Sequence, residues 1–109
     1  MNGEQLLSRI KSRLEDVYGE RLRGVVLYGS EARGESGEDS DIDLLVLLDG
    51  PVDLWKDLRT NIFALYDLQL GVIRPIHAMP VDVSAFQKGN IPSTAMLRGR
   101  GFLYDYGGA

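Results

Sequence analysis

The feature that most constrains the fold is the segment at residues 41–48, where alternation of polar and apolar residues gives way to a continuous apolar run. Asp41 and Asp43 alternate with apolar neighbours, and residues 44–48 are all leucine or valine. Short alternation indicates a half-buried strand, and an unbroken apolar run of this length indicates a buried one. The segment is therefore predicted to be a strand that begins at the surface and continues into the core of a sheet, with other elements packed against it.

Two helical patterns provide that packing. In the first, apolar residues recur at helical spacing between a cap at Asn2 and a stop at Gly19, which predicts an amphipathic helix. The second and longer helix is predicted over residues 52–70. It opens with Pro51 at its first helical position and is closed by Gly71.

Further strands complete the pattern. Branched and aromatic residues predict a strand at 22–28, and a third strand is predicted at 72–77, bent or placed at an edge by Pro75. Near the end of the chain, Ser93 is a candidate cap for a short helix, and residues 102–104 form a last apolar piece. This order predicts an α/β (α+β) fold, a small mixed β-sheet with helices packed against it.

Composition narrows the class of protein. The chain has 109 residues, 44% hydrophobic and 26% charged, which excludes a disordered chain and leads us to expect one domain over residues 1–109. The net charge of −4 argues against broad DNA binding, which depends on neutralising phosphates. Absence of cysteine excludes disulfides and thiolate chemistry. No leader-like pattern or apolar run of membrane length occurs, so a cytoplasmic protein is expected.

The paired acids carry the first chemical signal. Side chains at i and i+2 of a strand point to the same side, so the carboxylates of Asp41 and Asp43 are expected to lie side by side, about 7 Å apart along the strand. Adjacent carboxylates repel each other unless a cation lies between them. Oxygen ligands on a rigid element suit Mg²⁺, which takes its remaining ligands from water and phosphate. The alternative is a solvated strand end.

The residues after the first strand carry the second signal. Gly29 lets the backbone approach a ligand closely, and Ser30 can begin a helical turn whose free N–H groups favour phosphate. Ser30 could instead serve only as a helix cap, and Arg33 could contact phosphate or pair with nearby acids. With the acid pair, this turn predicts a site for a metal-bound nucleoside triphosphate.

The arrangement Gly29-Ser30, ten residues, then Asp41-x-Asp43 resembles the signature of the DNA polymerase beta-type nucleotidyltransferase superfamily. The fuller pattern is similar to its minimal nucleotidyltransferase (MNT) proteins, commonly the antitoxin halves of HEPN/MNT toxin–antitoxin pairs. The resemblance covers nearly the whole chain, from the leading helix to the closing residues 101–104. It implies the polymerase beta-like fold and ATP as substrate.

The resemblance also implies residue roles. Asp41 and Asp43 would hold two Mg²⁺ ions, and Gly29 and Ser30 would bind the outer phosphates. Family members carry a third carboxylate on the next strand, about where residues 72–74 lie, but none of these is acidic here. The nearest carboxylate is Asp82. If the chain turns back at Pro75 or Pro80, Asp82 is expected to be the third metal ligand. If the chain stays extended, the third ligand is missing.

The predicted function is transfer of a nucleotidyl group, AMP by resemblance, to an acceptor hydroxyl such as a tyrosine of a HEPN toxin. The rival is a catalytically weak or inactive protein that neutralises its partner by binding alone. Homo-oligomerisation is left open.

Trp55, Phe63 and Tyr66 lie on the periodic face of a helix and are expected to belong to the core or to an interface. His77 shows no partner at ligand spacing.

Overall fold

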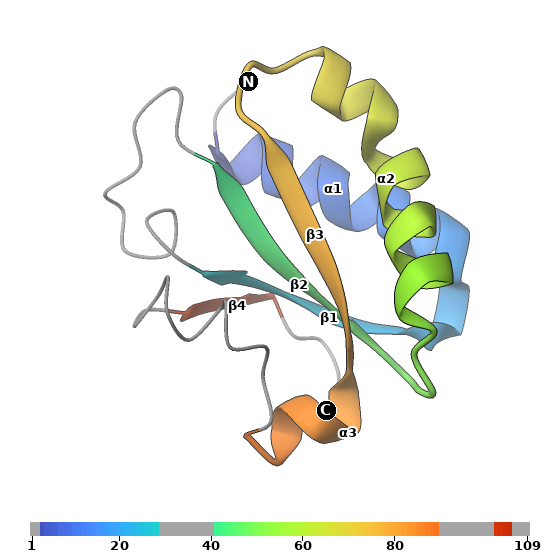
Figure 1. Ribbon diagram of the computed structural model, residues 1–109. Coiled ribbons are helices and arrows are strands. Elements are labelled where there is room, and N and C mark those ends of the chain that lie inside the picture. The colour runs from blue at the N-terminus through green and yellow to red at the C-terminus, as the bar shows by residue number, and fades with distance from the viewer. Residues whose placement is uncertain (1–2, 29–40, 90–101, 106–109) are drawn as a thin grey trace.

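The computed structural model describes residues 3–28, 41–89 and 102–105. In this part of the chain, helices alternate with the strands of one four-stranded sheet (Figure 1). The elements are α1 (Gly3–Tyr18), the short 3-10 helix η1 (Gly19–Arg21), β1 (Leu22–Tyr28), β2 (Ile42–Leu48), α2 (Leu54–Leu70), β3 (Ile76–Asp82), α3 (Val83–Gln87) and β4 (Phe102–Asp105).

The sheet has the order β3-β2-β1-β4, which places the predicted central strand inside it. β2 pairs antiparallel with β1 and parallel with β3, and β1 pairs antiparallel with β4. A parallel pair needs a crossover connection, and α2 supplies it between β2 and β3. All seven residues of β2 are buried, which confirms the prediction made from the apolar run. The mixed sheet with packed helices confirms the predicted fold class.

The two faces of β2 belong to different cores. Ile42, Leu44 and Val46 pack on the face covered by α1 and α2, whereas Leu45 and Leu47 pack on the face where α3 lies. This follows from the alternation of side chains along a strand. Figure 1 shows α1 and α2 together on one side of the sheet. Odd-numbered residues of β2 therefore point away from the two long helices.

The first helix follows its predicted pattern. Leu6, Ile10 and Leu14 are buried in the core, and the helix ends at Tyr18. Gly19 follows with φ of +59°, a conformation that favours glycine, which confirms it as the stop. Val17, three residues after Leu14, is by contrast 48% exposed at the last turn.

The long helix begins later than predicted. It starts at Leu54 rather than at Pro51, because the carboxylate of Asp53 caps it by accepting a hydrogen bond from the backbone N–H of Lys56. Gly71 ends it, as predicted.

The third strand is displaced from its predicted position at 72–77. The side chain of Gln69 accepts a hydrogen bond from the backbone N–H of Ile76 and donates one to the carbonyl of Arg74, which stabilises a turn through residues 72–75. The strand therefore begins only after Pro75. β3 is an edge strand in this sheet, so the missing N–H of Pro80 breaks no ladder on its outer side.

The remaining predictions concern the ends of the chain. The apolar piece at 102–104 lies in β4, whereas the helix α3 was not predicted. The proposed cap at Asn2 and the helix after Ser93 lie outside the described residues. Within the described ranges, no helix has both the length and the apolar character needed to cross a bilayer.

Candidate functional site

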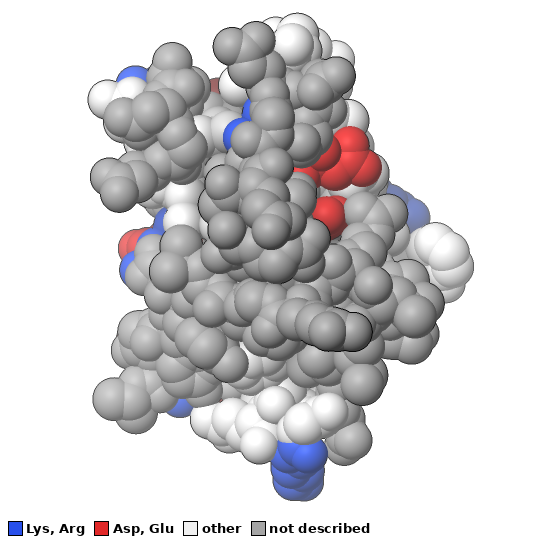
Figure 2. All heavy atoms as spheres, turned by 90° about the vertical axis from the view of Figure 1, so that its left-hand side faces the viewer, with Lys and Arg blue, Asp and Glu red and all other residues white. Residues whose placement is uncertain are grey.

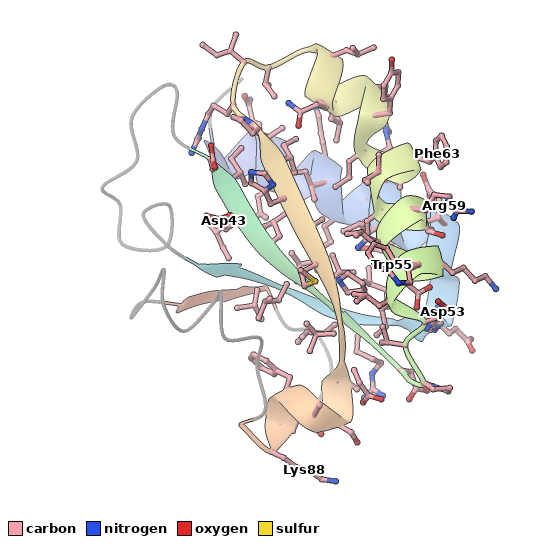
Figure 3. The ribbon with its side chains drawn as sticks, in the orientation of Figure 1. Asp43, Asp53, Trp55, Arg59, Phe63 and Lys88 are labelled. Carbon is pink, nitrogen blue, oxygen red and sulfur yellow. The ribbon has the colours of Figure 1, made fainter. Side chains whose placement is uncertain are left out.

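The acidic pair lies where the central strand begins. Asp41 directly precedes β2 and its side chain is 41% exposed, whereas Asp43 is the second residue of the strand and only 6% exposed. The alternation of β2 places Asp43 on the face away from α1 and α2, and Figure 3 shows it near the start of the strand. Figure 2 views the molecule from the left-hand side of Figure 1, and the largest group of acidic atoms visible there lies at the upper right.

The phosphate-binding turn was predicted beside this pair. Tyr28, the last residue of β1, is the register partner of Asp43, so the chain leaves β1 next to the acids. Gly29, Ser30 and Arg33 themselves lie outside the described residues. Their roles stay predictions.

His77 is the residue that sequence analysis missed. In the parallel pairing of β2 with β3 it is the register partner of Asp43, and its Nε2 lies 3.2 Å from Oδ2 of Asp41. The ring is about half exposed. Sequence analysis could have found this contact only by predicting that the third strand begins after Pro75. That start sets the pairing of β3 with β2 in which His77 lies beside Asp43.

The structure contradicts the prediction that Asp82 completes a three-carboxylate cluster. Asp82 ends β3 and is the register partner of Leu48, five residues along β2 from Asp43, or roughly 16 Å at the rise of a strand. Its carboxylate caps α3 by accepting the backbone N–H of Ser84, at 2.8 Å. It also packs directly over Gly50, where a Cβ atom would collide with it. β3 stays extended, and no turn brings Asp82 back.

The donor set decides which metal could bind. Within the described ranges no three Asp, Glu, His or Cys side chains are grouped closely enough to hold a metal ion between them. Mg²⁺ does not need three protein ligands, because it commonly binds one or two carboxylates and completes its shell with water and substrate phosphate. Asp41 and Asp43, two residues apart where a rigid strand begins, fit that requirement.

A network on the other face of the sheet fixes the position of β3. Asn61 of α2 is only 1% exposed and donates its amide to the carbonyl of Ala78, at 3.0 Å, next to His77. Asn61 also accepts the hydroxyl of Tyr18. Burial, and then the charge of Asp57, raise the pKa of Tyr18 to about 12, so the hydroxyl remains a donor.

An ion pair anchors the start of α2 in the same network. Both terminal nitrogens of Arg21 donate to the carboxylate of Asp57, at 2.9 and 2.8 Å. Asp57 is 2% exposed and also accepts the backbone N–H of Asp53. The guanidinium of Arg21 holds the pKa of this carboxyl below its usual range. The pair therefore holds α2 against the end of η1, just before β1 begins, and through Asn61 holds β3 in register.

A groove of about 280 Å³ runs between α2 and β3 and reaches the site. Its lining is mostly apolar, with Ile62 and Tyr66 on the helix side and Met79 on the strand side. His77 also contributes to the lining, so the groove leads to the side chain that contacts Asp41.

The chain resembles proteins of one family throughout. The family model of the nucleotidyltransferase domain matches residues 7–98. A putative protein adenylyltransferase of Methanocaldococcus jannaschii is 34% identical over 73 residues, which cover 67% of this chain and 73% of that protein. The protein adenylyltransferase MntA of Thermococcus cleftensis is 36% identical over 72 residues, which cover 64% of this chain and 71% of that protein.

Solved structures share the fold. A putative nucleotidyltransferase from Sulfolobus solfataricus superposes with a TM-score of 0.54 at 18% identity, over 92% of this chain and 78% of that one. A chain in the structure of a toxin–antitoxin MntA–HpeT mutant gives 0.55 at 14% identity, over 100% of this chain and 74% of that one. At these identities the likeness concerns the fold.

Proposed function

Because the chain belongs to the nucleotidyltransferase family, we propose that it transfers the AMP group of ATP to a hydroxyl of a partner protein, with a tyrosine of a HEPN-type toxin as the acceptor. The observation that supports the proposal is that Asp43, at the start of the central strand, is the register partner of Tyr28 at the end of β1, with Asp41 two residues before it and 3.2 Å from His77. The relatives named protein adenylyltransferase support AMP transfer to a protein. The related fold in a toxin–antitoxin structure motivates the choice of a toxin.

The reaction exchanges one phosphorus–oxygen bond for another. The acceptor oxygen bonds to the α-phosphorus, the bond to the bridging oxygen of the β-phosphate breaks, and pyrophosphate leaves with that electron pair while the hydroxyl proton passes to water. Mg²⁺ ions, when bound, neutralise the charge that develops on the attacking and leaving oxygens. Asp41 and Asp43 would hold the metal, and Gly29, Ser30 and Arg33 would bind the phosphates.

The second candidate is a partner-binding protein with little catalysis. One observation favours it: the residue beside Asp43 on β3 is His77, and the nearest acid along that strand, Asp82, lies at its far end. A site with two carboxylates could bind a nucleotide and still transfer it slowly. Both candidates keep the fold and the partner, and they differ in turnover.

A transfer assay separates the two candidates. The protein is mixed with Mg²⁺, ATP labelled at the α-phosphorus and a purified HEPN-type toxin, and label on the toxin is measured. Wild type should label the toxin, and Asp43→Asn should reduce the rate by orders of magnitude. Asp82→Asn is the matched control, since it removes a carboxylate from the same sheet but keeps a good helix cap. Toxin binding without labelling would favour the second candidate, and equal labelling by Asp43→Asn would contradict the proposed site.

A further inference from the structure

The outer face of α2 carries an apolar stripe that no described residue covers. We define the stripe by Trp55, Arg59, Ile62, Phe63, Tyr66 and Leu70. Its five apolar members are between 58% and 73% exposed, although large side chains of this kind usually lie in a core. Arg59 is also exposed and makes no hydrogen bond or ion pair with any described residue. Figure 3 shows Trp55, Arg59 and Phe63 in succession along the helix.

The stripe is comparable in area to the largest apolar patch that a typical monomer exposes. A buried aromatic side chain covers about 150–250 Å², so Trp55, Phe63 and Tyr66 leave roughly 300–500 Å² of aromatic surface uncovered. Ile62 and Leu70 enlarge this area. The largest apolar patch on a typical monomer is about 300–600 Å², and a stable interface covers about 800 Å² on each partner. The stripe therefore equals the largest patch of a typical monomer and has the area of the apolar centre of an interface, with surrounding residues of each copy supplying the rest.

The spacing of the stripe indicates that a helix covers it. Trp55, Arg59, Ile62 and Tyr66 follow one another at intervals of four, three and four residues, which is the repeat of helices that pack along a shared seam. Phe63 and Leu70 lie four residues after Arg59 and Tyr66, so they extend the seam along one of its edges.

The order of residues in the stripe is complementary to itself. An antiparallel second helix, centred between residues 62 and 63, places Leu70 opposite Trp55 and Tyr66 opposite Arg59. The same arrangement places Phe63 opposite Ile62. Every member of the stripe thus meets another member. The apolar residues meet apolar residues, and the guanidinium of Arg59 meets an aromatic ring that attracts it.

We propose that the stripe is the interface of a homodimer, in which the α2 helices of two copies pack antiparallel about a two-fold axis between Ile62 and Phe63. Such an interface is isologous, with the same patch on both copies, as in most dimers. Asp43 lies on the other face of the sheet, so the dimer leaves the acids uncovered (Figure 3). The proposal does not depend on the reaction.

The first test measures mass in solution. Sedimentation or light scattering of the full chain should give twice the monomer mass of 12.1 kDa at micromolar concentration. Phe63→Glu should give the monomer mass, because two carboxylates would be buried near the axis. Val17→Glu is the matched control: it replaces an exposed apolar residue on α1 and should leave the dimer intact. Circular dichroism of both variants checks that they fold.

The second test measures the register, and it uses the absence of cysteine in the chain. Trp55→Cys and Leu70→Cys are prepared as separate single variants. A short bifunctional thiol reagent should join the two variants when they are mixed. Neither should be joined to itself, because like positions lie about 22 Å apart along the antiparallel pair, at 1.5 Å per residue.

Three results would overturn the proposal. A monomer at all concentrations would leave the stripe to another protein's helix. A dimer that persists in Phe63→Glu would place the interface elsewhere. Self-joining of Trp55→Cys, without joining in the mixture, would exclude the antiparallel arrangement.

Discussion

His77 brings an imidazole into contact with the acidic pair, where the family resemblance led us to expect a third carboxylate. Its Nε2 lies 3.2 Å from Oδ2 of Asp41, and its backbone is in register with Asp43. A side chain that hydrogen-bonds a metal-binding carboxylate fixes the direction of that carboxylate. In the proposed site, His77 therefore orients Asp41.

Replacement of His77 tests that role. Loss of a group that orients a metal ligand typically costs 10- to 100-fold in metal affinity, so His77→Leu should raise the Mg²⁺ concentration needed for ATP binding by about 10-fold or more. His77→Asn, whose amide can still donate to Asp41, should retain more of the affinity. Titration of ATP binding against Mg²⁺ measures both. Identical titrations for wild type and His77→Leu would show that the contact has no part in binding.

The acidic pair could be predicted from local sequence, whereas its neighbour on β3 could not. The position of Asp41 and Asp43 at the start of the buried strand follows from the alternation and apolar run of 41–48, which the sequence already contains. The neighbour depends on where β3 begins, and that start is set by Gln69, whose side chain bonds Arg74 and Ile76 across a turn. A shift of the strand start changes which residue lies beside Asp43, so Asp82 was favoured and His77 was missed.

At the scale of elements, the Arg21–Asp57 pair joins the end of η1 to the first turn of α2. Breaking a buried pair costs about 3–5 kcal/mol, mainly because one charge stays buried without its partner. Arg21 is a third exposed, so we expect Arg21→Met to lower the free energy of unfolding by about 3 kcal/mol. The double variant Arg21→Met, Asp57→Leu should recover part of that loss, since no carboxylate remains buried. Urea unfolding of the three proteins measures this, and equal stability of the single variant and wild type would contradict it.

The same pair predicts a dependence of stability on pH. Arg21 holds the pKa of Asp57 below its ordinary value of 3.8, so the folded state favours the ionised carboxylate. This contribution is complete above the unfolded pKa and is lost as pH falls through the lower, folded value. Wild type should therefore lose stability below about pH 4 more steeply than Asp57→Asn. Unfolding curves at a series of pH values test this, and parallel losses would show that other groups dominate.

The bounds of the helices could be predicted from the sequence more accurately than the side of each helix that packs against the sheet. The bounds of α2 follow from capping chemistry within two or three residues, but periodicity alone could not say which of its two apolar sides faces the sheet. Leu65 and Leu68 are buried, while Phe63 and Tyr66 are exposed, because the sheet and α1 can cover only one side of the helix. The exposure of Trp55, Phe63 and Tyr66 contradicts the prediction that they belong to the core, and the interface stays a prediction.

At the scale of the whole molecule, the layers separate the two proposed activities. The long helices cover one face of the sheet, the acids lie on the other, and the apolar stripe lies on the outer surface of α2 (Figures 1 and 3). The acids and the stripe therefore lie on different surfaces, although Ile62 and Tyr66 of the stripe also line the groove that reaches His77. Each can be removed by substitution without removing the other.

This separation allows ligand binding to be measured through stability. A ligand that binds only the folded state stabilises it, by about 2.7 kcal/mol at a concentration 100 times its Kd. For a domain of this size each kcal/mol raises Tm by about 4–8 °C, so saturating ATP with Mg²⁺ should raise Tm by on the order of 10 °C. The double variant Asp41→Asn, Asp43→Asn should keep its fold, because the change relieves repulsion between two acids, and should lose the shift.

The Tm shift must be measured at one fixed protein concentration, because a dimer that dissociates on unfolding has a Tm that depends on protein concentration. Phe63→Glu supplies the matched control: its Tm without ligand should be lower and independent of concentration, yet ATP with Mg²⁺ should still raise it. A shift that survives in the double aspartate variant would mean that ATP binds elsewhere, away from Asp41 and Asp43. A shift that disappears in Phe63→Glu would mean that the site requires the second copy, since the stripe and the acids lie on different faces of one chain and share no residue.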